Sequence, residues 1–215
     1  MNIDILCSDI LHPVNKFLQN WIKIRSNKHI INIARQPCEL RGGDILFLIS
    51  VSEIIKKNIR DLYTAALVLH ASDLPEGRGW SPYIWQIIEG ANEITVSLLE
   101  AEDNVDAGAI LSKISFNLEG HELLDEINEK LFSTEIDLME YAISHLSEIE
   151  TRAQDDRTPT YYKRRTSEDS QIDPEKSLAS QFDLLRVVDP IRFPAFFNLR
   201  GHRYYLTISK DLPNE

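Results

Sequence analysis

Two clusters of residues combine side chains that can do proton chemistry. The first is the segment 70–82, HASDLPEGRGWSP, which opens with His70, and the second is the segment 103–108, DNVDAG, which contains Asp106. An imidazole facing a carboxylate suits acyl transfer, because the carboxylate orients the imidazole and relays a proton while an N–H stabilises charge on a carbonyl oxygen. The residues alone leave two alternatives open, a structural histidine and a plain Asx turn.

Other kinds of site have less support. The eight glycines form no G-x-G-x-x-G or Walker pattern, and no serine lies in a nucleophile elbow, which disfavours dinucleotide binding, P-loop chemistry and serine catalysis. The remaining histidines show no ligand spacing with His70, and two cysteines cannot form a four-thiolate site. We therefore expect no metal.

Composition places the chain among acidic globular proteins. Its 215 residues include 23 basic and 34 acidic side chains, a formal net charge of −11, which disfavours a nucleic-acid partner. No apolar run reaches the length of a membrane span, and Met1 to Leu6 lack the basic flank of a secretory leader. We expect a cytoplasmic protein with no membrane partner.

The apolar periodicity around the clusters predicts a Rossmann-like α/β fold, a mostly parallel sheet flanked by helices. The expected strands cover 3–7, 30–34, 44–49, 65–69, 93–99 and 109–116. The expected helices cover 12–24, 52–62, 82–89 (with Ser81 as its cap) and 122–146. Both clusters follow the carboxyl end of an expected strand, where open α/β sheets place their sites.

The last third of the chain has a different composition. Polar residues dominate 151–173 and predict an exposed connector, whereas helical periodicity over 172–188 and alternation over 203–209 predict a small C-terminal helix-plus-hairpin appendage. We divide the chain into a catalytic domain, 1–150, and a linker with appendage, 151–215. The appendage's aromatic residues form either its own small core or a homodimer contact: Phe196, Phe197, Tyr204 and Tyr205.

The two clusters also carry a family resemblance. The string His-x-Ser-x-Leu-Pro-x-x-Arg-Gly over 70–79, a Pro-led helix ending at Gly90, Thr95 and the segment 105–108, VDAG, resemble in order and spacing the folate-dependent formyltransferases. That family includes methionyl-tRNA formyltransferase, glycinamide ribonucleotide formyltransferase and the amino-sugar N-formyltransferases. The likeness covers most of residues 1–200 and implies transfer of a formyl group from 10-formyltetrahydrofolate to an amine.

The resemblance implies a site of an Asn, a His and an Asp. His70 and Asp106 match the last two, but the Asn position is occupied by Val68, which offers no side-chain hydrogen bond. Losing one such donor costs on the order of a hundredfold to a thousandfold in rate. Ser50, Ser52 and Ser72 are candidate substitutes, and Ser72 is included among the catalytic residues. The alternatives are reliance on His70 with a backbone N–H, and a catalytically weak chain.

The resemblance also implies binding residues for both substrates. Backbone groups near 50–54 and 100–105 would hold the pterin. The residues 52–54 could instead simply start a helix. The candidate cofactor-binding residues are Ser50, Ser52, Ile54, Glu100, Asp103 and Val105. The residues of the segments 80–82, 162–165 and 193–197 look most like those of the sugar formyltransferases. The substrate-binding candidates are therefore Arg78, Trp80, Tyr162 and Arg164, because Arg and Tyr suit a diphosphate and a base.

The sequence thus predicts an N-formyltransferase acting on a nucleotide-linked amino sugar. The acidic charge, and a remainder too short for a tRNA-binding barrel, disfavour tRNA. Two alternatives stay open: a non-catalytic folate- or nucleotide-binding scaffold, and a formyltetrahydrofolate hydrolase. The basic run 163–165 could equally be a solvated linker.

Overall fold

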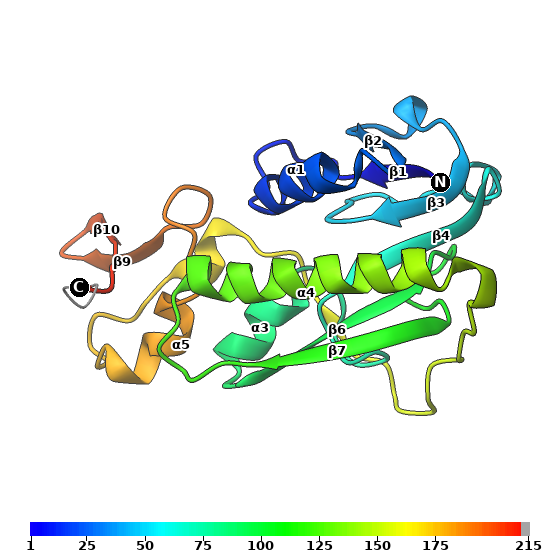
Figure 1. Cartoon of the computed structure of the whole chain (residues 1–215). Helices are drawn as coiled ribbons and strands as arrows, with labels where there is room; N and C mark the ends of the chain where they lie inside the picture. Colours follow the sequence, from blue (N-terminus) through cyan, green and yellow to red (C-terminus); the bar gives the residue numbers. More distant parts are fainter. Residues whose placement is uncertain (212–215) are drawn as a thin grey trace.

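A six-stranded sheet forms the centre of the computed structural model, which describes residues 1–211 (Figure 1). Its strand order is β2-β1-β3-β4-β6-β7, with β1 to β4 parallel and β6 and β7 antiparallel to their neighbours. The strands are β1 (Asn2–Leu6), β2 (Ile30–Ala34), β3 (Gly43–Leu48), β4 (Tyr63–His70), β6 (Glu93–Glu100) and β7 (Ile110–Asn117). The predicted α/β fold is confirmed.

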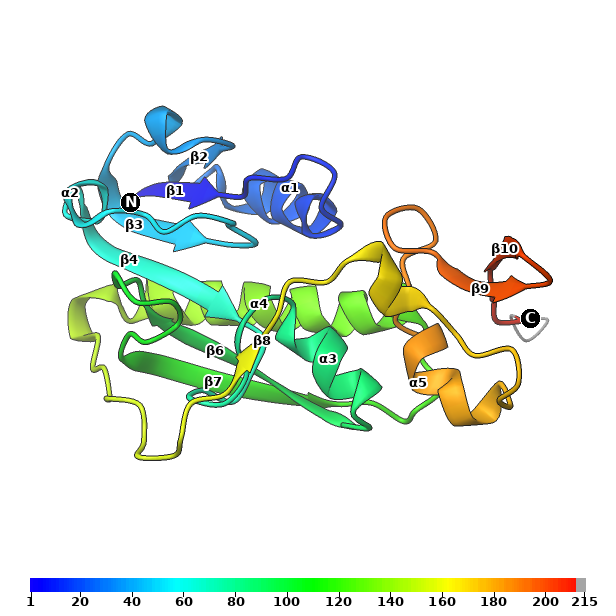
Figure 2. The same cartoon turned by 180° about the vertical axis from the view of Figure 1, so that it is seen from behind.

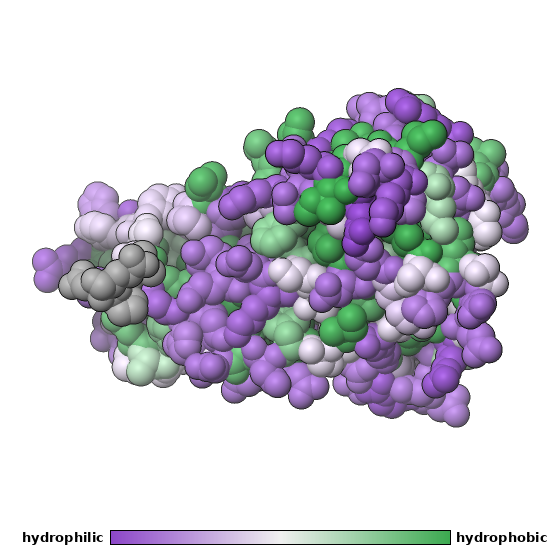
Figure 3. All heavy atoms as spheres, viewed as in Figure 1, coloured by the Kyte–Doolittle hydropathy of each residue, from purple (hydrophilic) through white to green (hydrophobic). Residues whose placement is uncertain are grey.

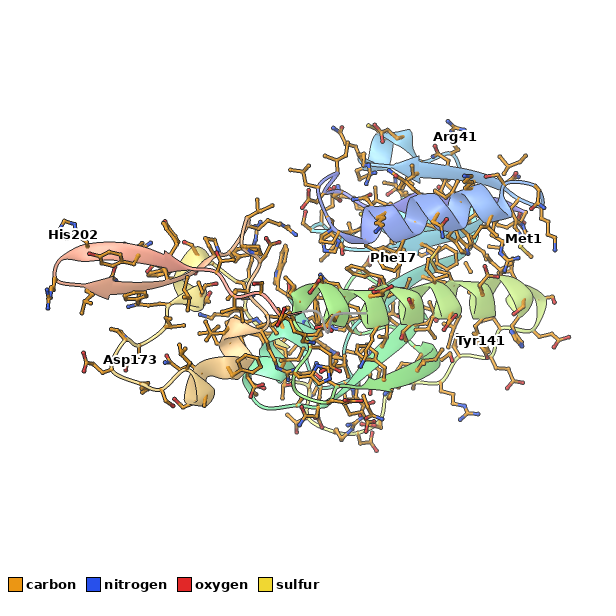
Figure 4. The ribbon with its side chains drawn as sticks, turned by 60° about the vertical axis from the view of Figure 1, so that its left-hand side comes forward. Met1, Phe17, Arg41, Tyr141, Asp173 and His202 are labelled. Carbon is orange, nitrogen blue, oxygen red and sulfur yellow. The ribbon has the colours of Figure 1, made fainter. Side chains whose placement is uncertain are left out.

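Two helices cover one face of this sheet. Helix α1 (Val14–Arg25) and helix α4 (Leu124–Ser144) pack on each other, with Phe17 between them and its ring edge-on to Phe132 at 5.3 Å (Figure 4). Alternate strand residues such as Ile45 and Phe47 point into this core. Each fully buried large apolar side chain contributes roughly 1.5–3 kcal/mol.

The opposite side of the sheet carries a smaller cluster. Leu46 and Leu48, which alternate with the residues of the first core, pack there with Ile55. Leu40, which follows the 3-10 turn η1 (Pro37–Glu39), and Ile59 of the short helix α2 (Lys57–Arg60) pack against them. Helix α3 (Pro82–Ile88) packs in a third cluster against the start of α4. The last two residues of β4, Leu69 and His70, are buried, with 6% and 7% of their surfaces exposed.

The C-terminal part begins after the 3-10 turn η2 (Leu146–Glu148). A long connector returns to the sheet domain, where β8 (Tyr161–Tyr162) pairs in parallel with β5 (Arg78–Gly79). Short turns, a hairpin and a four-residue helix follow: η3 (Ser167–Ser170), η4 (Ala179–Gln181), α5 (Phe182–Leu185), β9 (Ala195–Leu199) and β10 (His202–Leu206). The β9–β10 hairpin lies at the opposite end of the molecule from the N-terminus (Figure 2).

Three local predictions were wrong. The helix expected over 52–62 is reduced to α2, because Ser50 turns the chain with a left-handed φ of 53° and Arg60 Nη1 takes the carbonyl of Ile55 at 2.6 Å. The helix expected over 172–188 is reduced to η4 and α5. Ser81 has a φ of 46° and makes no capping bond through its side chain.

The appendage's aromatic residues are divided between core and surface. Phe196 is buried and Phe197 stacks on Tyr204 at 5.4 Å, whereas Tyr204 and Tyr205 are 46% and 65% exposed. A homodimer contact there stays a prediction, as does the domain boundary at 150. The face seen in Figure 3 is largely hydrophilic, with hydrophobic residues in separate patches. No helix within residues 1–211 is long and apolar enough to cross a membrane.

Candidate active site

A cavity of about 630 Å³ opens where β1, β3 and β4 end. Its size lies within the range of small-molecule sites. The walls come from loops that follow the strands, from the starts of α1 and α3, from α4 and from the C-terminal part: Ser8 to Pro13 in part, 50–55, 68–71, 79–84, 100–106 except Asp103, five residues of α4 and parts of 164–193. The cavity thus gathers residues of both clusters singled out from the sequence, His70 and Asp106 among them.

His70 is the last residue of β4 and lies buried at the cavity wall, only 7% exposed. Its Nε2 is 2.9 Å from the carbonyl oxygen of Gly77, and its Nδ1 is 3.6 Å from Asp106 Oδ2. A carbonyl only accepts hydrogen bonds, so Nε2 is the protonated nitrogen. Nδ1 is therefore the atom that can exchange a proton with Asp106 or with a ligand.

The loop that carries Asp106 is held by backbone contacts. Asp106 Oδ2 accepts the backbone N–H of Gly79 at 2.8 Å, and Gln154 Nε2 donates to the carbonyls of Asp106 and Gly108 at 2.7 and 3.0 Å. A Cβ at Gly108 would lie 1.9 Å from the carbonyl oxygen of Glu100, so the close approach of the two chains requires glycine.

The connector is largely exposed, as expected, but its side chains also bind the loop that follows His70. Thr160 Oγ1 accepts the backbone N–H of Gly77 at 2.8 Å. Arg157 and Lys113 hold Asp73 at 2.8 and 2.5 Å, and their hydrogen bonds lower the pKa of that carboxyl even though burial acts to raise it. Gln154, Arg157 and Thr160 were missed in the sequence, because polar connector residues give no periodic signal.

Comparison with known proteins identifies the family. A model described as "Formyl transferase" matches residues 23–143, more than half of the chain. The chain belongs to the formyl transferase family. A curated relative, the methionyl-tRNA formyltransferase of Fusobacterium nucleatum, is 27% identical over 194 residues, which are 88% of this chain and 62% of that protein. The chain therefore spans less than two thirds of that relative's length.

Solved structures, among them two formyltransferases, share the fold. Methionyl-tRNA formyltransferase from Clostridium thermocellum has a TM-score of 0.78 at 24% identity, covering 99% of this chain and 94% of that one. A 4-N formyltransferase from Francisella tularensis has a TM-score of 0.75 at 15% identity, covering 99% and 98%. HypX from Aquifex aeolicus, in complex with tetrahydrofolic acid, has a TM-score of 0.79 at 16% identity, covering 99% and 39%.

Within this formyl transferase fold, most of the predicted folate-binding positions line the cavity. They are Ser50, Ser52, Ile54, Glu100 and Val105. Asp103 does not line it, because its carboxylate pairs with Arg60 at 2.9 Å. Val68 is half-buried in the cavity wall.

The structure does not bring Ser72 to the cavity. Its side chain is 1% exposed, its Oγ has no hydrogen-bond partner among the described residues, and its carbonyl accepts from the Ser97 hydroxyl at 2.7 Å. Ser50 is placed differently, with its Oγ 3.2 Å from His12 Nε2 at the cavity wall. His12 Nδ1 accepts the backbone N–H of Val14, so Nε2 carries the proton, and burial together with Arg192 lowers the pKa of His12 to about 4.

The four predicted acceptor-binding residues are split in the same way. Trp80 and Arg164 line the cavity, and the Arg164 guanidinium lies 4.8 Å from the Trp80 ring centroid. Arg78 donates instead to Tyr161 and Gln154. Tyr162 donates to Glu89 and stacks on Trp85. Among residues 1–211 no group of three or more His, Cys, Asp or Glu side chains is arranged to hold a metal ion.

Proposed function

We propose that this protein transfers a formyl group from 10-formyltetrahydrofolate to the amine of a nucleotide-linked amino sugar. The observation that carries the proposal is the His70–Asp106 pair, with 3.6 Å between Nδ1 and Oδ2, at the wall of a cavity in a chain of the formyl transferase family. An imidazole facing a carboxylate at the end of a sheet strand suits proton transfer during acyl chemistry.

The reaction requires one proton to be moved. The acceptor nitrogen forms a bond to the formyl carbon and loses a proton, and the folate nitrogen that loses the formyl group gains one. His70 Nδ1 and the carboxylate of Asp106 are the two groups placed to take and return that proton. The Gly77 carbonyl fixes the imidazole by accepting from Nε2, and the Gly79 N–H fixes the carboxylate. Such positioned acid–base groups contribute about 10²- to 10⁴-fold in rate.

The cavity residues fit a folate. Ile54 and Val105 line the cavity from two different loops and leave 51% and 45% of their surfaces exposed, which provides apolar contact for a flat ring. Residues 50–52 and 100–102, which end β3 and β6 or follow them, supply backbone groups to the same cavity. When bound there, the folate supplies the formyl group.

The missing amide at Val68 calls for another hydrogen-bond donor. Of the three serines considered, Ser50 and Ser52 line the cavity and Ser72 does not. Ser50 is paired with the neutral imidazole of His12, and the two share the cavity wall. We assign this pair as the replacement that polarises the formyl oxygen.

The rim of the cavity supports a nucleotide-linked acceptor. Arg164 stacks over Trp80, a residue that is 37% exposed, and Arg192 lies beside Phe193, with 5.9 Å from its guanidinium carbon to the ring centroid. A guanidinium next to an open aromatic face suits a diphosphate joined to a base. Arg192 also pairs with Asp9 at 2.9 Å, which links the C-terminal loop to the loop after β1.

Methionyl-tRNA is the second candidate acceptor, because the curated relative is a methionyl-tRNA formyltransferase. The net charge of −11 speaks against a large phosphate-backbone contact. The two candidates differ in one measurable respect, since only tRNA binding should fall steeply with salt.

The proposal is tested by mass spectrometry of acceptors. The protein is incubated with 10-formyltetrahydrofolate and, in parallel, a panel of UDP-linked 4-amino sugars, methionyl-tRNA, or no acceptor. A mass gain of one formyl group on a sugar supports the proposal, and a gain on methionyl-tRNA alone replaces the acceptor. Release of product folate without acceptor indicates a hydrolase, and folate binding without any transfer indicates a scaffold; both outcomes refute the proposal.

A further inference from the structure

Helix α4 carries a carboxyl group at a position where its core-facing stripe calls for an apolar side chain. Glu135 follows Leu131 by one helical turn and precedes Leu138 by another, and both leucines are buried in the main core. Glu135 itself is only 7% exposed. The helix therefore buries an acid in the middle of its apolar face.

The carboxyl of Glu135 is not satisfied by the protein. Its Oε2 is buried and has no hydrogen-bond partner among residues 1–211. Glu122, near the start of the same helix, is equally buried but receives the Lys130 ammonium at 2.6 Å and the backbone N–H of Glu119 at 3.0 Å. Unsatisfied buried polar atoms are rare in folded proteins and need an explanation.

Glu135 lines the same cavity as His70. Around it the cavity wall is mostly apolar, with Leu131 and Phe132 from α4 and Ile84 from α3. Two polar groups of the lining already have partners. The Tyr83 hydroxyl donates to Asn128 at 3.0 Å, and His12 pairs with Ser50. Three buried side-chain atoms of the lining have no partner among residues 1–211, Ser8 Oγ, Arg165 Nε and Glu135 Oε2, and that of Glu135 is the one on the α4 wall.

Burial alone raises the pKa of Glu135 to about 8. At neutral pH the side chain is therefore mostly a neutral carboxylic acid, which both donates and accepts a hydrogen bond. A hydroxyl has the same double capacity, and an amine N–H can donate to the carbonyl oxygen of the acid.

We infer that Glu135 determines acceptor specificity by hydrogen-bonding an O–H or N–H group on the ring of the acceptor, apart from the nitrogen that His70 and Asp106 serve. The inference rests on the proposed function. It assigns the acceptor to the class of polyhydroxylated or amino-substituted rings, because an acceptor without a polar group at this position would leave the buried carboxyl unsatisfied.

The test compares Glu135→Gln and Glu135→Leu with wild type, and uses Glu129→Leu on the exposed face of α4 as the matched control. Steady-state kinetics with a UDP-linked 4-amino sugar give KM for both substrates. Calorimetry gives Kd for the sugar without folate, and thermal unfolding gives Tm. Analogues of the same sugar that lack one ring hydroxyl or amine at a time show which group the carboxyl binds.

Glu135→Leu is expected to raise KM and Kd for the sugar about tenfold or more and to leave KM for 10-formyltetrahydrofolate unchanged. Its Tm should rise by about 2–4 °C, because a buried unpaired acid is removed. Glu135→Gln should fall between Glu135→Leu and wild type, and one deletion analogue should bind wild type and Glu135→Leu equally.

Two results would overturn the inference while the proposed function stands. The first is turnover of the sugar by Glu135→Leu with KM and Kd within twofold of wild type. The second is a fall in Tm for both variants with both KM values altered alike, which is the signature of a structural carboxyl. If wild type neither binds nor formylates any sugar of the panel, the proposed function fails and the inference falls with it.

Discussion

Gly108 offers the sharpest test of how the Asp106 loop is positioned. Alanine at this position would place its Cβ 1.9 Å from the backbone carbonyl oxygen of Glu100, and ordinary contact begins at 3.4 Å. The loop must therefore retreat by about 1.5 Å, since two backbones cannot interpenetrate. Asp106, two residues upstream, is expected to move with it.

That displacement acts on the two contacts that define the site. The Gly79 N–H to Asp106 bond of 2.8 Å and the 3.6 Å approach of Asp106 to His70 would both lengthen. A misplacement of about 1 Å costs on the order of 100-fold in rate. Gly108→Ala should therefore lower kcat/KM for formyl transfer about 100-fold, while overpacking lowers stability by about 1–3 kcal/mol.

Gly120→Ala is the matched control. Gly120 has a φ of 92°, so alanine strains the backbone there by about 1–2 kcal/mol, but its Cβ would meet nothing closer than 3.9 Å. Both variants should unfold at lower temperature than wild type, and only Gly108→Ala should lose activity. A folded Gly108→Ala protein with kcat/KM within twofold of Gly120→Ala would refute the positioning argument.

Three further predictions concern other parts of the molecule. Val68→Asn restores the amide that the family resemblance places two residues before the histidine; because Ser50 and His12 already supply a donor, kcat should change less than tenfold, whereas a rise of about a hundredfold or more would refute the assignment of that pair. Gln154→Leu removes the donor to two carbonyls of the Asp106 loop and should lower kcat about tenfold in steady-state assays with Tm nearly unchanged, whereas full activity would show that the loop holds itself. The pKa of Glu122 is about 2 against an ordinary 4.5, because the Lys130 and backbone hydrogen bonds outweigh burial. Its ionised carboxylate therefore contributes about 3 kcal/mol, fully present above pH 4.5 and lost as the pH falls through 2. Urea unfolding should show Glu122→Gln less stable than wild type at pH 7 with the difference shrinking toward pH 2, and a difference independent of pH would contradict this assignment.

The strands of the sheet were predictable because their chemistry is local. Apolar runs such as 44–49 bury both faces, and β-branched residues favour extended backbone, so length and composition suffice. The prediction of a helix over 52–62 was wrong because the conformation of this segment is not decided by local chemistry. Ile54, Ile55 and Ile59 recur at helical spacing, but Ile55 enters the core under α2 while Ile54 stays 51% exposed at the cavity.

The site was predictable only in part. His70 ends β4, and Asp106 lies in the loop after β6, which pairs antiparallel with β4. The order of the motifs predicted that the two residues belong to one site, but the carboxyl ends of antiparallel strands lie at opposite edges, so strand ends alone could not predict their 3.6 Å approach. Gln154 and Thr160 reach the site from the connector, and the polar sequence of the connector does not predict which groups they bind. Glu135 did leave a signal, an acid on the apolar stripe of a helix, which sequence analysis can detect but which only the cavity makes meaningful.

His70 and Asp106 are proposed to move the proton of a formyl transfer. The most direct test is the rate of formyl-product formation by wild type, His70→Ala and Asp106→Ala under saturating substrates. Circular dichroism confirms that each variant is folded. The account predicts turnover by wild type and a loss of about 10²- to 10⁴-fold or more in each folded variant. Full activity in either folded variant would contradict it.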